Sequence, residues 1–287
     1  MESITRFDRL ELKFRLTRAQ AQTLRAALVE RLLPDPHAGP TGRYPIIGTY
    51  LDNQDRDIYV NQLMGLPSRR KVRVRVYGQA ADHPEGICFL EVKHKYGGRT
   101  SKRRLGLSAA EAQALLAGDP LERPLDERDR LVLTEVRRMV LEMGLAPVCI
   151  MRYDREAWTG QGTEADLRVT FDSGLRARAR DLLRIQADDP DFDLDLLAAD
   201  ERIVEIKVDQ SVPLWLARLV ADLGLHTQSC SKYQLAVEAL GLRPKGLSIA
   251  LPEDWALGRQ AWTASQQGAA LSAAAGKDLL WTPRPTF

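Results

Sequence analysis

Residues 71–77 read KVRVRVY, and charged and apolar side chains alternate along most of this stretch. A period of two is typical of a β-strand with one apolar face and one charged face. The same alternation recurs in four other stretches, and two further stretches are also expected to be strands. The alternating stretches are residues 9–16, 71–77, 89–95, 166–172 and 203–209, and the two further strands are residues 46–52 and 148–153.

Stretches with helical periodicity lie between these strands. Two of them begin with a capping box, formed by Thr17 with Gln20 and by Ser108 with Glu111. The expected helices are residues 17–33, 108–116, 127–143, 213–223 and 231–240. Because strands and helices do not follow a strict βαβ rhythm, the sequence predicts an α+β fold with a large antiparallel sheet or barrel.

The composition is that of an ordinary globular protein. The chain has 287 residues, of which 44% are hydrophobic and 28% are charged. No stretch approaches the roughly 18–20 apolar residues of a membrane span, and the charged N-terminus does not resemble a signal peptide. Cys88, Cys149 and Cys230 are few and widely spaced, which favours a reducing cytoplasm and small core residues over disulfides or a zinc site. The region from Pro244 to the end predicts a mostly irregular tail.

The net charge of +2 hides two blocks of opposite sign. Residues 69–104 carry eleven Lys or Arg against three acidic residues, whereas residues 185–209 carry nine acidic residues against two basic ones. A basic block can bind nucleic acid, acidic lipid or phosphate. Aromatic residues are only 6% of the chain and do not interleave with the basic block, which disfavours a stacking platform for single-stranded nucleic acid.

The charged strand faces decide the functional hypothesis. Amphipathic helices must bury their apolar stripes, and the apolar strand faces are the partners available in quantity, so the charged faces are expected to line a groove or lumen. Facing Lys and Arg side chains repel one another unless an anion lies between them, and Arg forks match phosphate oxygens. Interspersed Glu residues offer the hard oxygen ligands that Mg²⁺ and Mn²⁺ prefer. The alternative is an ordinary barrel with an apolar interior and solvated charges.

Lys232 follows a predicted helix cap. Ser231 and Gln234 have capping spacing, which places Lys232 in the first helical turn, where a cation opposes the helix dipole. A bound phosphate would reverse that unfavourable sign, because helix N-termini favour anions. The simpler alternative is an exposed lysine.

Taken in order, these motifs resemble the VTC (vacuolar transporter chaperone) domain, a member of the CYTH-like triphosphate tunnel metalloenzymes. The motifs are RLELKF from residue 9, YPIIGTYLD from 44, KVRVRVYG from 71, FLEVKHK from 89, SKRRL from 101, MRYDREAW from 151, LRVTFD from 167, IVEIK from 203 and CSKY from 230. The resemblance implies an antiparallel β-barrel tunnel with a charged lumen, coated by helices, in a domain covering residues 1–243 before a tail of residues 244–287.

The resemblance also implies an activity and a site. The activity is that of an ATP-dependent polyphosphate polymerase, which transfers the γ-phosphoryl group of ATP to a growing inorganic polyphosphate chain with Mn²⁺ or Mg²⁺. The implied phosphate-binding residues are Lys13, Arg73, Arg75, Lys93, Lys102, Arg155, Arg168 and Lys232, all but Lys102 also assigned to catalysis. Glu205 is the implied principal metal ligand, and Glu11 and Glu91 are assigned as assisting ligands from their strand faces. Lys207 and Arg178 are weaker candidates for the lumen.

Other functions stay open on the sequence alone. The first alternative is a hydrolase of the same fold that cleaves triphosphate or a nucleoside triphosphate. The second is a polyphosphate-binding module without catalysis. A nucleic-acid-binding protein ranks last because the basic residues of 69–75 alternate on a strand face. ATP and polyphosphate are therefore the expected partners, without nucleic acid, and Trp158 is expected to pack rather than to stack on a nucleobase.

Overall fold

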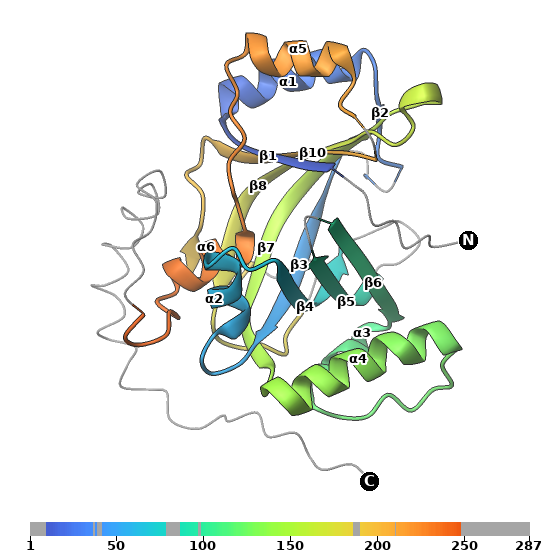
Figure 1. Cartoon of the computed structure of the whole chain (residues 1–287), viewed down its shortest axis with the longest axis vertical. Helices are drawn as coiled ribbons and strands as arrows, with labels where there is room; N and C mark the ends of the chain where they lie inside the picture. Colours follow the sequence, from blue (N-terminus) through green and yellow to red (C-terminus); the bar gives the residue numbers. More distant parts are fainter. Residues whose placement is uncertain are drawn as a thin grey trace.

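The computed structural model describes residues 10–36, 38, 42–78, 87–96, 99–185, 190–209 and 211–247. These residues form one antiparallel sheet with helices around it (Figure 1). The strands are β1 (Leu10–Thr17), β2 (Leu33–Pro34), β3 (Arg43–Asp52), β4 (Ser68–Tyr77), β5 (Ile87–Tyr96), β6 (Arg99–Leu107), β7 (Ala146–Thr159), β8 (Arg168–Arg178), β9 (Leu194–Asp195) and β10 (Glu201–Val208). The helices are α1 (Arg18–Val29), α2 (Asp57–Leu63), α3 (Ala109–Ala117), α4 (Glu127–Met143), α5 (Leu214–Asp222) and α6 (Lys232–Ala239).

The sheet curls into a half-barrel. Its strand order is β1-β10-β8-β7-β3-β4-β5-β6, with β2 paired to β7 and β9 paired to β8. Within the described residues no ladder joins β1 to β6, yet Lys93 of β5 donates a hydrogen bond of 2.9 Å to the Glu11 carboxylate of β1. The two ends of the strand order therefore face each other across the hollow, and the predicted α+β class with a curled antiparallel sheet is confirmed.

The apolar strand faces pack against the helices, as the sequence predicts. At one end of the sheet, Phe14 and Val204 share a buried cluster with Leu24 of α1. At the other end, Val74 of β4 shares a second cluster with Leu116 of α3 and with residues of α4. In Figure 1, α1 and α5 lie over β1 and β10, whereas α3 and α4 lie beside β5 and β6. With the apolar faces covered by helices, the charged faces turn toward the hollow, and the alternative of an apolar interior is wrong.

Several elements differ from expectation. Strand β6 and helix α2 do not follow from the sequence periodicity, and β7 continues to Thr159, well beyond residue 153. Helix α2 follows Arg56, which adopts a left-handed backbone and does not cap the helix with its side chain, because a guanidinium group has only donors. Instead the Asp52 carboxylate accepts hydrogen bonds of 3.0 Å from the backbone N–H groups of Ile58 and Tyr59. Both predicted capping boxes, at the starts of α1 and α3, are present.

Smaller expectations are also settled. The three cysteines are buried and free, which confirms them as core residues. Trp158 is buried in the cluster beneath α1, and its indole N–H donates to Glu156 over 2.9 Å, so it packs as predicted. None of the helices in the described residues is both long and apolar enough to cross a bilayer. Arg9 and the predicted tail beyond residue 247 lie outside the described residues.

Candidate functional site

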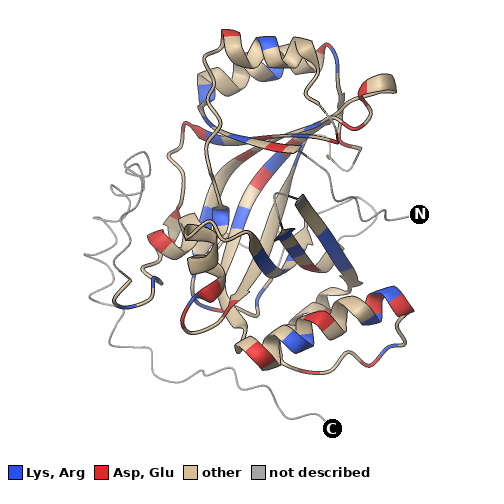
Figure 2. Ribbon diagram, in the orientation of Figure 1, with Lys and Arg blue, Asp and Glu red and all other residues tan. Residues whose placement is uncertain are grey.

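The hollow of the half-barrel holds a cavity of about 750 Å³. Eleven basic and three acidic side chains line it, and Figure 2 shows basic positions repeated along the surrounding strands. The basic residues are Lys13, Lys71, Arg73, Arg75, Lys93, Lys102, Arg104, Arg155, Arg168, Lys207 and Lys232. The structure thus brings together all eight residues that the motifs assign to phosphate, together with Lys207. It adds Lys71, which the alternation had placed on a charged face, and Arg104.

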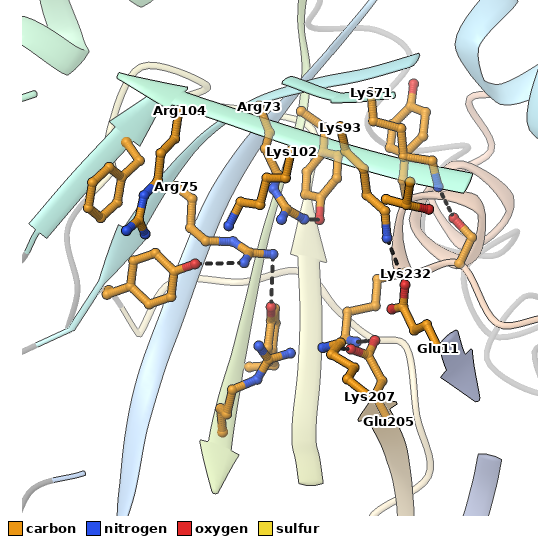
Figure 3. Close-up of a pocket in the computed structure, with 18 of the residues that line it drawn as sticks. Glu11, Lys71, Arg73, Arg75, Lys93, Lys102, Arg104, Glu205, Lys207 and Lys232 are labelled. Atoms are coloured by element: carbon orange, nitrogen blue, oxygen red, sulfur yellow. Dashed lines mark hydrogen bonds and ion pairs between the residues drawn. The ribbon is translucent and has the colours of Figure 1, made fainter. Parts of the chain in front are cut away.

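Strand alternation produces this lining. Residues two apart on one strand share a face, and the register then pairs charged faces of neighbouring strands. Lys13 lies opposite Glu205, and Arg73 lies opposite Glu91. In Figure 3, the labelled side chains of β4, β5 and β6 point toward those of β1, β10 and α6 across the cavity. The cations therefore project from opposite walls into one shared cavity.

Glu91 anchors the cations of the wall formed by β4, β5 and β6. Its carboxylate is only 1% exposed and accepts hydrogen bonds from Arg73, whose nitrogen atoms lie 2.8 Å and 2.7 Å away. Lys102 forms an ion pair with the same carboxylate. Burial alone would raise the pKa of Glu91, but Arg73, Arg75 and Lys102 hold it well below its usual range. Glu91 is therefore a fixed anion that organises these three cations.

Tyrosine hydroxyls form a second set of contacts that the motifs do not assign. Arg75 donates to the Tyr77 and Tyr153 hydroxyls over 2.9 Å and 3.2 Å, and Arg73 donates to Tyr50 over 2.9 Å. Burial would raise the pKa of Tyr77, but Arg75 and Lys102 together lower it to about 7. Tyr77 thus titrates near neutrality inside the cavity.

Lys232 reaches the cavity from the first turn of α6. Its side chain is 9% exposed, and its ammonium lies 2.7 Å from Asp172 and 3.3 Å from Glu205, so the alternative of an exposed lysine is wrong. Asp172 is fully buried and also accepts a bidentate pair of 2.7 Å hydrogen bonds from Arg155. These carboxylates offset the unfavourable position of the cation at the helix N-terminus. Asp172 belongs to a charged strand face, but no role follows for it from the sequence.

Glu205 and Glu11 are brought together by one lysine. The Lys13 ammonium lies 3.3 Å from Glu205 and 3.4 Å from Glu11, and Lys207 contacts Glu205 at 2.5 Å. Burial opposes ionisation of both carboxylates, but these lysines lower the pKa of each well below its usual range. Two ionised, hard oxygen donors therefore face the cavity side by side.

This pair fits a divalent cation only in part. The described residues contain no group of three or more His, Cys, Asp or Glu side chains close enough to hold a metal ion. Glu91 accordingly does not join Glu205 and Glu11, and its oxygens are taken by cations on the opposite wall. Mg²⁺ is commonly held by one or two carboxylates together with water and substrate phosphates, and Glu205 with Glu11 fits that arrangement.

Arg168 lines another part of the cavity, together with Asp35 and Tyr44. It forms an ion pair with the buried Asp35, and its guanidinium lies 3.4 Å from the Tyr44 hydroxyl. Tyr44 in turn donates to Asp35 over 3.1 Å. Asp35 precedes the first long central strand in an irregular segment, so no periodicity pointed to it.

Arg178, a weaker candidate for the lumen, does not line the cavity. It is fully buried, and its guanidinium donates to the backbone carbonyls of Asp191 and Arg184 over 2.7 Å each. The β7–β8 register shifts by one residue between Arg152 and Asp154. A shift of one residue exchanges the two faces of a strand. Arg168 and Arg178 are an even number of residues apart, but because the shift lies between them, only Arg168 points into the cavity.

Fold and cavity together define a half-barrel protein with a cationic lumen. A family model for the VTC domain matches residues 8–241, so the chain belongs to the VTC domain family. A search of curated proteins found no match.

Among solved structures, the chain is similar to a Bacillus halodurans protein provisionally described as an adenylate cyclase, with 11% identity, a TM-score of 0.49, and coverage of 79% of this chain and 96% of that one. It is also similar to the PH1819 protein of Pyrococcus horikoshii, with 11% identity, a TM-score of 0.43, and coverage of 80% and 98%. A Vibrio parahaemolyticus protein with the same provisional description has 12% identity, a TM-score of 0.41, and coverage of 80% and 98%.

Proposed function

We propose that this protein is an ATP-dependent polyphosphate polymerase that transfers the γ-phosphoryl group of ATP to an inorganic polyphosphate chain. The observation that carries the proposal is the convergence of eleven basic side chains on one cavity of about 750 Å³. Arg forks and Lys ammonium groups are the side chains that bind phosphate oxygens best. Membership of the VTC domain family supports the same substrate class.

The lysines of the cavity support an anionic ligand. Burial and the nearby Lys13, Lys93 and Arg73 lower the pKa of Lys71 well below its usual range. Burial likewise lowers the pKa of Lys207 to about 8, with Glu205 opposing the shift. A phosphate chain beside these amines would favour their charged forms, because opposite charges within a few ångströms stabilise each other. An anion bound in the cavity would thus raise the pKa of both lysines.

The reaction asks little covalent work of the protein. An oxygen of the terminal phosphate of the chain forms a bond to the γ-phosphorus of ATP while the bond from that phosphorus to the β-phosphate bridging oxygen breaks, which leaves ADP and a chain one unit longer. Positioning and charge neutralisation are the main tasks in such transfers. Arg73, Arg75 and Arg155 are held rigidly by buried partners, so they can stabilise the developing charge without reorganising.

A divalent cation fits this scheme at the carboxylate pair. Glu205 and Glu11 would hold Mn²⁺ or Mg²⁺, which when bound supplies further positive charge to the phosphate oxygens. Lys13 contacts both carboxylates and keeps them ionised and close together. The Lys13 ammonium would yield its place at these oxygens to a bound divalent cation and would then bind a phosphate oxygen.

The experiment that tests this proposal measures products. The purified protein is incubated with ATP and Mn²⁺ or Mg²⁺, with and without a short polyphosphate primer, and chains are resolved on a polyphosphate-stained gel. Metal-dependent chains are expected, and Glu205→Ala and Arg73→Ala should abolish them. Lys102→Ala and Arg103→Ala form a matched pair on β6, because Lys102 lines the cavity whereas the neighbouring Arg103 lies on the other face and forms an ion pair with Glu135 of α4. Only the first should lose activity.

Two other outcomes would overturn the proposal in distinct ways. Orthophosphate release without chains, lost in the same variants, would assign the cavity to a triphosphate hydrolase. Polyphosphate binding without turnover, unaffected by Glu205→Ala and by removal of divalent metal, would assign it to a binding module.

A further inference from the structure

A second group of arginines lies outside the cavity. Arg43 and Glu156 are paired across β3 and β7, directly next to Tyr44 and Arg155, which line the cavity. Because neighbouring residues on a strand point to opposite faces, Arg43 and Glu156 lie on the outer face of the sheet. That face is the one on which α1 packs.

This outer face carries a small pocket of about 100 Å³ between α1 and the sheet. The charged and polar side chains that line it include Arg18 and Arg25 of α1, Arg43, Glu156, Ser173 and Arg202. Four guanidinium groups thus meet a single carboxylate. The volume corresponds to about three water molecules, far less than the roughly 300 Å³ of the smallest pockets for drug-sized ligands.

The single carboxylate is committed to two of the four arginines. Glu156 is buried and forms ion pairs with Arg25 and with Arg43, and it also accepts the indole N–H of Trp158. These contacts hold two of the guanidinium groups in place at the pocket.

The other two arginines are surplus cations. Arg202 donates to the backbone carbonyls of Ala199 and Glu201. Burial, and after it the like charges of Arg43 and Arg18, lower the pKa of Arg202, and the nearby Asp200 only partly opposes this shift. Arg18 is the first residue of α1, where a cation opposes the helix dipole and an anion is favoured. The side chains that line the pocket therefore carry four positive charges against one negative charge, and neither Arg18 nor Arg202 contacts the Glu156 carboxylate in the way that Arg25 and Arg43 do.

We propose that this pocket is a second anion site that binds one phosphoryl group, separate from the cavity of the half-barrel. The guanidinium groups of Arg18 and Arg202 match the charge and the paired oxygens of a phosphate dianion. The phosphoryl group belongs either to free orthophosphate or to the end of a polyphosphate chain. The site does not depend on the proposed polymerase activity.

The test compares phosphate binding by calorimetric titration at one fixed salt concentration. Inorganic orthophosphate and linear tripolyphosphate are titrated separately into the full chain and into Arg18→Ala/Arg202→Ala. This variant spares Arg25 and Arg43, so Glu156 keeps its partners. We expect a class of sites in the wild type that the variant binds at least about tenfold more weakly, since each lost charged hydrogen bond costs about that factor. Retained tripolyphosphate binding in the cavity shows that the variant is folded.

Arg128→Ala/Arg138→Ala is the matched control. Both arginines are exposed on α4, so the control makes the same change in net charge far from the pocket, and it should bind like the wild type. Loss of an orthophosphate site in Arg18→Ala/Arg202→Ala identifies the free anion as the ligand, whereas loss of a tripolyphosphate site alone identifies the end of a chain. Unchanged binding of both probes in that variant, or equal losses in the control, would overturn the proposal.

Discussion

Ionisation of Tyr77 is expected to weaken the binding of phosphate above neutral pH. Its hydroxyl accepts a hydrogen bond of 2.9 Å from Arg75, and its pKa is lowered to about 7 because Arg75 and Lys102 outweigh the effect of burial. Above that pH the group is a phenolate that occupies Arg75 and adds a negative charge to the cavity. Below it the neutral phenol leaves the cationic lining free for phosphate.

The size of the effect follows from the fraction of the phenol form. With a pKa of about 7, about 90% of the protein carries the phenol near pH 6 and about 10% near pH 8. If phosphate binds only the phenol form, the apparent dissociation constant is divided by that fraction. Affinity for triphosphate should thus fall about tenfold between these two pH values because of Tyr77. Tyr77→Phe has no phenol to ionise, so this factor should vanish.

The assay is a titration of tripolyphosphate into wild type and Tyr77→Phe at matched pH and ionic strength. The ligand itself and Lys207, whose pKa lies at about 8, also titrate in this range. They do so equally in both proteins, and the ratio of the two dissociation constants isolates Tyr77. A ratio that stays constant from about pH 6 to about pH 8 would refute the assignment of the neutral titration to this residue.

Glu205→Gln should reduce metal-dependent turnover by about 100-fold or more. The same variant should bind tripolyphosphate more tightly in the absence of metal, because Lys13 loses a competing anion. Weaker metal-free binding, measured by calorimetry, would contradict this prediction. Tyr233→Phe loses a 2.7 Å hydrogen bond to the buried Asp52 and should lower the free energy of unfolding by about 1.5–3 kcal/mol. Urea denaturation measures this change, and an unchanged midpoint of unfolding would contradict the prediction. Arg178→Ala should lower the thermal unfolding temperature without changing the affinity of the folded protein for tripolyphosphate, since its partners are backbone carbonyls outside the cavity.

Much of the fold follows from periodicity. Alternation in β4 predicts both the strand and its charged face, because a period of two fixes which side chains share a face. The requirement that amphipathic helices bury their stripes then fixes which face turns outward. Strand β6 was not predicted because basic residues occur on both of its faces. Lys102 points into the cavity, whereas the neighbouring Arg103 forms a 2.6 Å ion pair with Glu135 of α4.

The motifs predict which basic residues line the cavity, whereas the partners of these residues depend on the strand register, which the sequence does not show. The motifs point to Arg73 and Arg155 but not to their partners: Glu91, expected as an assisting metal ligand, holds Arg73, and Asp172 holds Arg155. A partner on a neighbouring strand is known only once the strands are aligned. Asp172 stands on a predicted charged face, and only the β7–β8 register shows that it holds Arg155. The misplacement of Arg178 has the same origin, since a one-residue shift between strands leaves no mark in the sequence.

The carboxylates of the cavity fall into two classes with different consequences. Glu91 and Asp172 are essentially inaccessible to solvent and hold arginines by short hydrogen bonds, so removing either would leave uncompensated buried charge. Glu205 is also buried, whereas the Glu11 side chain is 21% exposed, and both are held by lysines, which are flexible and compact cations. An incoming phosphate chain can therefore replace Glu11 as the partner of Lys93 without disturbing the arginines, whereas Lys232 keeps its 2.7 Å contact with the buried Asp172. The buried carboxylates thus keep the arginines in place, and Glu11 can release its lysine to a stronger anion.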